Sequence, residues 1–185
     1  MFPGQVRIIG GAWRGRKLIV PTLPQLRPTP DRVRETVFNW LAPVIVGANC
    51  LDAFAGSGAL GFEALSRGAA QATFIDESSV VIKTLKETAE RLDAKNADIY
   101  RANVPEQLHK PKKLFDIVFL DPPFQKNILL PTCFFLEEQN FLAKEAYIYL
   151  EASDFLQQNT LPQNWELLKQ KKAGHVAYHL VKRLA

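Results

Sequence analysis

The sequence predicts an α/β fold with a mostly parallel sheet of seven strands, covered by helices on both faces. From residue 49 onward, short apolar runs rich in branched and aromatic side chains alternate with segments of helical periodicity. Such repeated strand–helix units require parallel strands. The last two apolar runs are separated only by a short turn at Ala173 and Gly174, which predicts an antiparallel hairpin at one edge of the sheet. A smaller β-hairpin and a helix precede these repeats.

The composition is typical of one globular domain with a full core. The chain has 185 residues, of which 47% are hydrophobic and 23% are charged. No apolar stretch reaches membrane-spanning length, and the first residues lack the apolar segment of a signal peptide. Cys50 and Cys133 are isolated, and the three histidines form no zinc-binding pattern. We therefore expect reduced thiols, no metal, no membrane contact and a cytoplasmic monomer.

The net charge of +4 is concentrated at the N-terminus. Residues 1–41 hold seven basic and two acidic side chains, which gives +5, and the remaining residues hold 16 basic and 17 acidic side chains, which gives −1. This pattern indicates a polyanionic partner, although a solvated basic arm without a partner has the same charge. The candidate RNA-binding residues are Arg7, Trp13, Arg14, Arg16, Lys17, Arg32 and Arg34. We expect residues 1–42 to form this RNA-binding extension and residues 43–185 to form the α/β domain.

The extension begins with a hairpin over residues 5–21. Its apolar residues alternate with other residues, and glycines at positions 10, 11 and 15 allow the turn. Basic side chains near the tip, together with Trp13, suit contact with an RNA backbone and stacking on a base. Trp13 can equally cap a small apolar cluster.

A proline-rich connector, residues 23–30, leads from the hairpin to the first helix. Thr29 is the expected N-cap of this helix and Pro30 its first residue. Pro43 ends the helix. Arg32 and Arg34 lie near its N-terminal turn, where free backbone N–H groups favour a phosphate.

The elements that follow alternate regularly. Strands are expected over residues 50–54, 72–76, 97–101, 115–120, 146–151, 165–171 and 175–182. Helices are expected over residues 59–67, closed by Gly68, and over 78–92. A short helical segment is expected over residues 104–108, and a helix broken by Pro131 between the fourth and fifth strands.

The loop after the first of these strands predicts a cofactor site. Residues 56–61 fit the G-x-G-x-x-G pattern between a strand and a helix, and Asp76 ends the next strand, where an acid can bind ribose hydroxyls. This context fits a dinucleotide or S-adenosylmethionine. Asp52 favours S-adenosylmethionine, because a carboxylate four residues before the first glycine would attract an ammonium group and repel a pyrophosphate. Asp52 can instead cap a turn.

Asn103, just past the third strand, can hydrogen-bond an adenine edge or be an ordinary turn residue. Glu63 and Arg67 are four residues apart on one helix and predict a surface ion pair. The candidate cofactor-binding residues are Asp52, Phe54, Gly56, Ser57, Gly58, Asp76 and Asn103.

The strand over residues 115–120 ends in the candidate catalytic motif, Asp121, Pro122, Pro123 and Phe124. Ligands of open α/β sheets bind at the carboxyl ends of strands, and the prolines hold the backbone rigid. The Asp121 carboxylate and the Pro122 carbonyl could accept both hydrogens of a nucleobase amine and aim its nitrogen at a sulfonium methyl group. Phe124 could stack on that base. The structural alternative is a tight turn leaving the strand.

Five stretches of the sequence resemble the RsmD family, the bacterial 16S ribosomal RNA guanine-N2 methyltransferases. They run from Gln5 to Lys17, Leu26 to Thr36, Asp52 to Gly61, Asp121 to Phe124, and Ala173 to Tyr178. The third and fourth are shared by many amino-methyltransferases, whereas the first two are more specific. Asp76 departs from the glutamate often expected there, but either acid can bind a ribose.

The resemblance implies a Rossmann-like class I methyltransferase fold and S-adenosylmethionine as the methyl donor. It also implies one guanine of 16S rRNA as the target, within the small ribosomal subunit or its assembly intermediate. From the residues alone, three alternatives stay open. These are an amino-methyltransferase acting on DNA adenine N6 or a protein glutamine, an NAD-dependent oxidoreductase, and a non-catalytic RNA-binding assembly factor.

Overall fold

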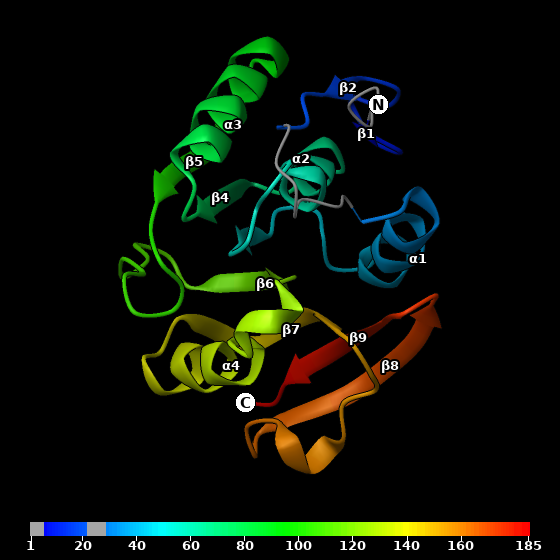
Figure 1. The fold of residues 1–185 in the computed structure, drawn as a ribbon, viewed down its shortest axis with the longest axis vertical. Coiled ribbons are helices and arrows are strands. Elements are labelled where there is room, and N and C mark those ends of the chain that lie inside the picture. Colours follow the sequence, from blue (N-terminus) through cyan, green and yellow to red (C-terminus); the bar gives the residue numbers. More distant parts are fainter. Residues whose placement is uncertain (1–5, 22–28) are drawn as a thin grey trace.

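A single seven-stranded sheet runs through the computed structural model, which describes residues 6–21 and 29–185 (Figure 1). The strand order is β5-β4-β3-β6-β7-β9-β8. The strands are β3 (Asn49–Asp52), β4 (Gln71–Asp76), β5 (Ala97–Arg101), β6 (Phe115–Leu120), β7 (Leu142–Ala152), β8 (Trp165–Ala173) and β9 (Val176–Arg183). Strands β3 to β7 pair in parallel, and β9 pairs antiparallel with both β7 and β8. The predicted mostly parallel sheet with an antiparallel C-terminal hairpin is confirmed.

The helices are α1 (Asp31–Leu41), α2 (Ala59–Ser66), α3 (Ser79–Leu92) and α4 (Leu129–Glu138), with 3₁₀ turns η1 (Phe124–Lys126) and η2 (Gln158–Thr160). Two predictions were wrong. Residues 104–107 form turns instead of a helical segment. Pro131 does not break its helix, because it is the third residue of α4. In the first helical turn, the N–H group that proline lacks has no intrahelical partner to lose.

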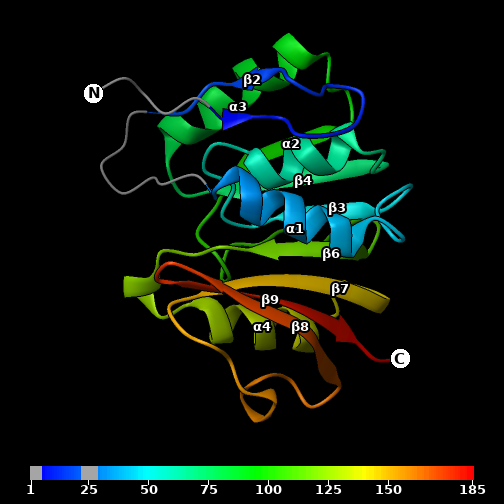
Figure 2. The same cartoon turned by 90° about the vertical axis from the view of Figure 1, so that its right-hand side faces the viewer.

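The sheet separates two apolar layers. Phe119 and Tyr149 belong to a core cluster with residues of α1, α2 and α3, whereas their neighbours Leu120 and Leu150 belong to a cluster with residues of α4. This alternation follows from the two-residue period of a strand. Figure 2 shows α1 and α2 in front of the sheet and α4 behind it. Both faces are covered, as the parallel sheet requires.

The N-terminal hairpin is shorter than predicted. β1 (Val6–Arg7) pairs antiparallel with β2 (Lys17–Leu18), and the predicted first residue, Gln5, lies outside the described residues. The side chains of Val6, Ile8 and Leu18 are buried in the same core cluster as α1, α2 and α3. The hairpin is therefore packed into the core of the fold. Residues 22–28, most of the expected connector, also lie outside the described residues.

Ser66, the last residue of α2, holds the loop of the hairpin. Its carbonyl accepts a hydrogen bond from the Ala12 N–H group (2.8 Å), and its hydroxyl accepts one from the Trp13 N–H group (2.9 Å). Gly11 has a φ of +77°, and a Cβ atom there would overlap the Ser66 carbonyl. Only glycine allows this close approach of the loop to the helix end.

A buried ionic cluster joins the hairpin, α1 and α2. Arg34 and Glu63 have no exposed surface, and Arg34 donates to the Arg7 carbonyl (2.8 Å) and to Asp31 (2.6 Å). Glu63 forms an ion pair with Arg67 (2.7 Å). Two predictions were therefore wrong. Arg34 is a buried structural residue and cannot reach RNA, and the Glu63–Arg67 pair is buried on its acidic side because the hairpin covers this face of α2.

Thr29 does not cap α1 as predicted. Pro30 is the N-cap residue, and its side chain makes no capping hydrogen bond. Thr29 is buried, and its hydroxyl faces the ends of β6 and β7. No helix within the described parts of the chain is long and apolar enough to cross a membrane.

Candidate active site

The carboxyl ends of three adjacent strands bring the predicted cofactor and catalytic residues to one edge of the sheet. β3 is hydrogen-bonded to β4 on one side and to β6 on the other. Asp52 is the last residue of β3, Asp76 is the last of β4, and Asp121 directly follows β6. Because parallel strands end at the same edge, the glycine loop and the Asp121 motif are neighbours.

The glycine loop connects β3 to α2 in conformations that other residues rarely adopt. Gly56 has a φ of +50° and Gly58 a φ of +74°. A Cβ atom at Gly58 would lie 2.6 Å from the Phe62 ring and 2.7 Å from Leu85. The glycines therefore allow both the left-handed backbone and the tight approach of the loop to α2 and α3.

Asp52 is a buried carboxylate, with 3% of its surface exposed. Its Oδ2 atom accepts a hydrogen bond from the Gly61 N–H group (2.9 Å) in the first turn of α2. Asp52 therefore bonds the first turn of α2, nine residues along the chain, and does not cap a turn of its own, while Oδ1 accepts no hydrogen bond from the described residues. Burial raises the pKa of Asp52 to about 7, the Gly61 hydrogen bond opposes this rise, and the charge of Asp76 adds to it. A cationic ligand would favour the ionised form.

Asp76 is fixed by backbone hydrogen bonds. Its Oδ2 atom accepts from the Gly56 N–H group (3.1 Å) and its Oδ1 atom from the Ser78 N–H group (2.9 Å). Each carboxylate oxygen has room for a second donor, such as a ribose hydroxyl. The adjacent Glu77 forms an ion pair with Lys126 (2.7 Å), which ties the end of β4 to η1 across the edge of the sheet.

The other predicted cofactor residues differ in exposure. Ser57 is buried, and Phe54 is half-buried against the core cluster that contains α4. Asn103 is exposed, and its backbone N–H group donates to the Gln107 side chain (3.0 Å). Because this bond uses only the backbone of Asn103, it leaves the side-chain amide available for a ligand.

The predicted catalytic motif leaves the sheet at the end of β6. Asp121 is half-buried and Pro122 is buried, whereas Pro123 and Phe124 are exposed. Phe124 begins η1 and exposes 40% of its surface. An exposed ring next to a recessed carboxylate suits stacking on a flat ligand.

A second carboxyl group lies beside Asp121. The Thr29 hydroxyl is 3.2 Å from Glu151 Oε1 and 3.5 Å from Asp121 Oδ2, and the Tyr149 hydroxyl donates to Glu151 Oε1 (2.7 Å). Burial and the charge of Glu151 raise the pKa of Asp121 well above its usual value. Burial also raises the pKa of Glu151, while its hydrogen bonds from Tyr149 and Thr29 oppose the rise.

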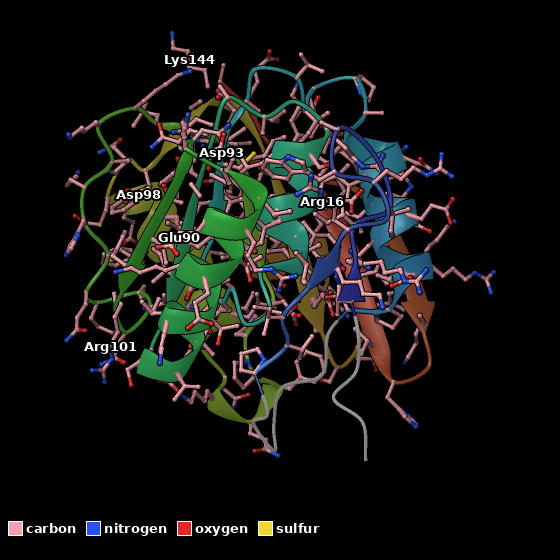
Figure 3. The ribbon with its side chains drawn as sticks, turned by 90° about the horizontal axis from the view of Figure 1, so that it is seen from above. Arg16, Glu90, Asp93, Asp98, Arg101 and Lys144 are labelled. Carbon is pink, nitrogen blue, oxygen red and sulfur yellow. The ribbon has the colours of Figure 1, made fainter. Side chains whose placement is uncertain are left out.

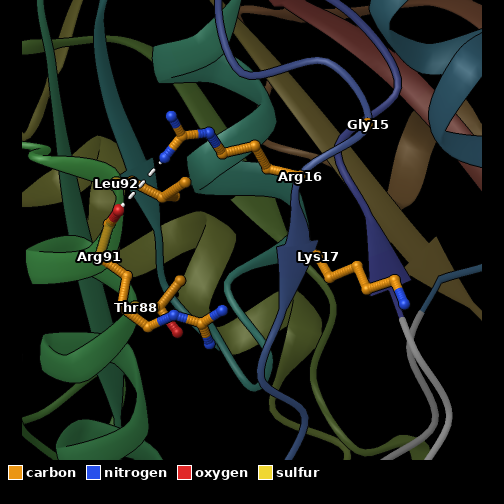
Figure 4. Close-up of a pocket in the computed structure, with 6 residues that line it drawn as sticks. All are labelled: Gly15, Arg16, Lys17, Thr88, Arg91 and Leu92. Carbon is orange, nitrogen blue, oxygen red and sulfur yellow. Dashed lines mark hydrogen bonds between the residues drawn. The ribbon is translucent and has the colours of Figure 1, made fainter.

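Five of the predicted RNA-binding side chains are exposed: Arg7, Arg14, Arg16, Lys17 and Arg32. Figure 3 shows Arg16 on the hairpin, beside α3. Arg16 donates to the Arg91 carbonyl (3.3 Å), and the two arginines line a hollow of about 350 Å³ between the hairpin and α3 (Figure 4). The contacts of Trp13 are structural, since its ring packs against the core cluster of α1 to α3. Its stacking on a base stays a prediction.

Residues 6–182 match a family described as conserved hypothetical protein 95. The chain belongs to this family, the RsmD family. It is 53% identical to ribosomal RNA small subunit methyltransferase D of Escherichia coli, over 98% of this chain and 92% of that protein. It is 46% identical to the protein of the same name from Haemophilus influenzae, over 96% and 93%.

The solved structures agree with this assignment. The yhhF protein of Escherichia coli matches this RsmD-family chain with a TM-score of 0.88 and 52% identity, over 98% of this chain and 99% of that one. The Rossmann-like class I methyltransferase fold and the predicted family are both confirmed. The chain is a methyltransferase.

The sequence did not single out Glu151, Thr29 or Arg91 as site residues. A signal existed for Glu151, because it is an acid at the end of a predicted parallel strand next to the strand of Asp121. Thr29 looked like a helix cap, which is the commonest use of threonine before a proline and a helix. Arg91 gave no signal, since only the folded chain brings α3 beside the hairpin.

Proposed function

We propose that this chain transfers a methyl group from S-adenosylmethionine to the exocyclic N2 amine of a guanine in 16S rRNA. The observation that carries this proposal is the adjacency of β3 and β6, which brings the glycine loop beside the Asp121 motif. The methyl donor and the amine would therefore meet at one edge of the sheet. The names of the relatives, small subunit ribosomal RNA methyltransferases, support rRNA as the substrate.

The residues present fit the proposed donor. Asp52 offers a buried carboxylate to the ammonium group of a methionine moiety, and Asp76 offers two fixed oxygens to ribose hydroxyls. The left-handed backbone of Gly56 and Gly58 leaves the loop without Cβ atoms, so that a ligand can approach it closely. When bound, the donor supplies an electrophilic methyl group on a sulfonium.

The motif would act on the acceptor amine. In our proposal, the Asp121 carboxylate and the Pro122 carbonyl accept its two hydrogens, which orients the nitrogen lone pair and favours a more tetrahedral, reactive nitrogen. Phe124 stacks on the guanine, which has left any helical stack. Most of the rate enhancement would come from orientation and electrostatics, since these groups need only hold the amine in line.

The basic hairpin and the start of α1 would bind the rRNA backbone through Arg7, Arg14, Arg16, Lys17 and Arg32. These side chains are exposed, and phosphate contacts of this kind contribute affinity without reading sequence. The substrate is a small subunit or its assembly intermediate in the cytoplasm, and the enzyme acts as a monomer. The 1–42 segment would then be the RNA-binding part of the enzyme.

A labelled-donor assay tests the proposal. Purified protein is incubated with methyl-labelled S-adenosylmethionine and small subunits from cells lacking the modification, and the rRNA is then digested to nucleosides. We expect labelled N2-methylguanosine. Label in DNA adenine or in a protein glutamine would identify a different acceptor, and no transfer at all would refute methylation of this substrate.

Variants distinguish catalysis from a purely structural role in ribosome assembly. Asp121→Asn removes the charge that grips the amine, so we expect the rate to fall at least about a hundredfold. Asp98→Asn, an exposed aspartate on β5, is the matched control and should keep the full rate. If the protein were an assembly factor without catalysis, Asp121→Asn would leave its effect in cells unchanged.

None of the relatives named above is an NAD-dependent oxidoreductase. Tight binding of NAD, without binding of S-adenosylhomocysteine, would indicate that activity instead.

A further inference from the structure

Among the described residues, the two carboxyl groups at the ends of β6 and β7 have hydrogen-bond contacts with only two hydroxyl donors, those of Tyr149 and Thr29. Glu151 is 4% exposed and receives the Tyr149 hydroxyl hydrogen. The Thr29 hydroxyl has a single hydrogen, so it can serve Glu151 or Asp121 but not both. Among the described residues, no lysine or arginine forms an ion pair with either carboxyl group. Two neighbouring carboxyl groups with so few donors cannot both be ionised at neutral pH, because their negative charges repel each other.

The hydrogen-bond geometry decides which carboxyl group carries the charge in the free protein. Glu151 Oε1 lies 2.7 Å from the Tyr149 hydroxyl and 3.2 Å from the Thr29 hydroxyl. The Thr29 hydroxyl is farther from Asp121 Oδ2, at 3.5 Å. Hydroxyl donors stabilise a carboxylate, so this geometry favours the negative charge on Glu151 and the proton on Asp121.

We propose that Glu151 is a positioning residue that sets the ionisation of Asp121 by sharing one proton with it across the Thr29 hydroxyl. The proposal rests on the proposed methyl transfer to an amine. When the amine offers its N–H hydrogens to Asp121, the shared proton moves to Glu151, and Asp121 meets the amine as a carboxylate. The N–C bond then forms as the C–S bond breaks, with its electron pair staying on sulfur, and the surplus proton on nitrogen passes to Asp121 and from there to water.

Other titratable groups face this pair, and the test must distinguish their titration from that of Asp121 and Glu151. Asp52 on β3 adds a further negative charge near Asp121, and Tyr178 on β9 lies near Tyr149. A saturating concentration of the methyl donor would hold Asp52 in its ionised form, so Asp52 would not titrate in the assay. Burial and the charge of Glu151 raise the pKa of Tyr149 well above its usual value, so its phenol does not ionise in the acidic range.

The test is the pH profile of kcat/KM for small-subunit methylation at saturating donor, compared between the unaltered protein and Glu151→Gln. Glutamine keeps the size of the side chain but removes the charge that raises the pKa of Asp121. The acid limb of the profile should therefore move to lower pH by about one unit or more, with KM for the subunit unchanged. Glu145→Gln is the matched control, because Glu145 lies on the same strand but is exposed and paired with Lys182 (2.8 Å).

A second variant keeps the proposal testable if Glu151→Gln does not fold. Tyr149→Phe retains both carboxyl groups and removes one donor to Glu151, so the shared proton favours Glu151 and the acid limb again moves to lower pH. If the profile of the variant that folds superimposes on that of the unaltered protein, Glu151 does not set the ionisation of Asp121. If the unaltered protein methylates no subunit, the proposed function fails instead, so the two failures are distinct.

Discussion

Glu63→Ala should detach the N-terminal hairpin from α2 and strongly destabilise the protein. Glu63 has no exposed surface and accepts hydrogen bonds from the backbone N–H groups of Ile9 (2.7 Å) and Gly10 (2.8 Å). It also accepts one from Arg67 Nε (2.7 Å) and lies 3.6 Å from Arg34 Nη1. One carboxylate therefore joins three parts of the chain that are distant in sequence.

The size of the effect follows from what the substitution leaves behind. Arg34 would stay buried and keep its hydrogen bonds to Asp31 and to the Arg7 carbonyl. Its Nε and Nη1 atoms, which lack hydrogen bonds among the described residues, would lose the nearby charge of Glu63. Removing one partner of a buried ion pair costs about 3–5 kcal/mol, because the other charge stays in the interior. For a chain of this length, that corresponds to a fall in Tm of roughly 6–20 °C.

Urea denaturation followed by circular dichroism measures the free energy of unfolding. Glu87→Ala is the control, because Glu87 is an exposed glutamate on α3, and its loss should change the free energy of unfolding by less than about 0.5 kcal/mol. Replacing Glu63 and Arg34 together by leucine should cost less than Glu63→Ala alone, since no buried charge remains. A Glu63→Ala protein within about 1 kcal/mol of the unaltered one would show that this cluster does not hold the hairpin.

Three further substitutions test the site. Because burial raises the pKa of Asp52 to about 7, the affinity for S-adenosylhomocysteine, measured by calorimetry, should fall about fivefold from pH 7 to pH 6 as the carboxylate is protonated. Asp52→Asn should remove this pH dependence and lower the affinity at pH 7; unchanged affinity would leave Asp52 only its hydrogen bond to α2. Gly58→Ala should weaken cofactor binding, because its Cβ atom would push the loop away from Phe62, and binding at full strength would contradict that packing. Replacing Arg14, Arg16 and Lys17 together by alanine should weaken RNA binding and flatten its salt dependence, while the affinity for the cofactor stays unchanged. The control with the same loss of charge replaces Lys110, Lys112 and Lys113, which precede β6, and it should not weaken RNA binding in this way.

The strand–helix alternation made most of the fold predictable. Strand β6 was expected with its observed ends, and α3 to within one residue, because buried strands and amphipathic helices carry their own periodicity. The failures occurred where periodicity says little. A proline within a helical pattern predicts a break, but Pro131 lies in the first turn of α4, and local sequence defines the start of a helix poorly.

The candidate site was predictable wherever a residue ends, or directly follows, a strand of the parallel sheet. Asp52, Asp76 and Asp121 meet at one edge because strand adjacency alone brings them there. Arg34 was misjudged for the opposite reason, because its charge suggested RNA, while its burial depends on Glu63, 29 residues away in a different helix. Residue type and spacing predict which chemistry is available, whereas burial and partners decide which residues are free to use it.

Thr29 and Glu63 together change how the N-terminal segment should be understood. The sequence suggests a boundary near residue 42, because the basic surplus ends there. Several contacts cross that boundary. Among them, Glu63 accepts hydrogen bonds from the Ile9 and Gly10 amides, and the Thr29 hydroxyl lies between Asp121 and Glu151. The boundary therefore separates a basic segment from the rest of the chain, but side chains on both sides of it pack together. In the proposed function, a segment that is basic on its surface and also reaches the carboxyl groups at the end of β6 and β7 would both bind RNA and orient the Asp121 motif.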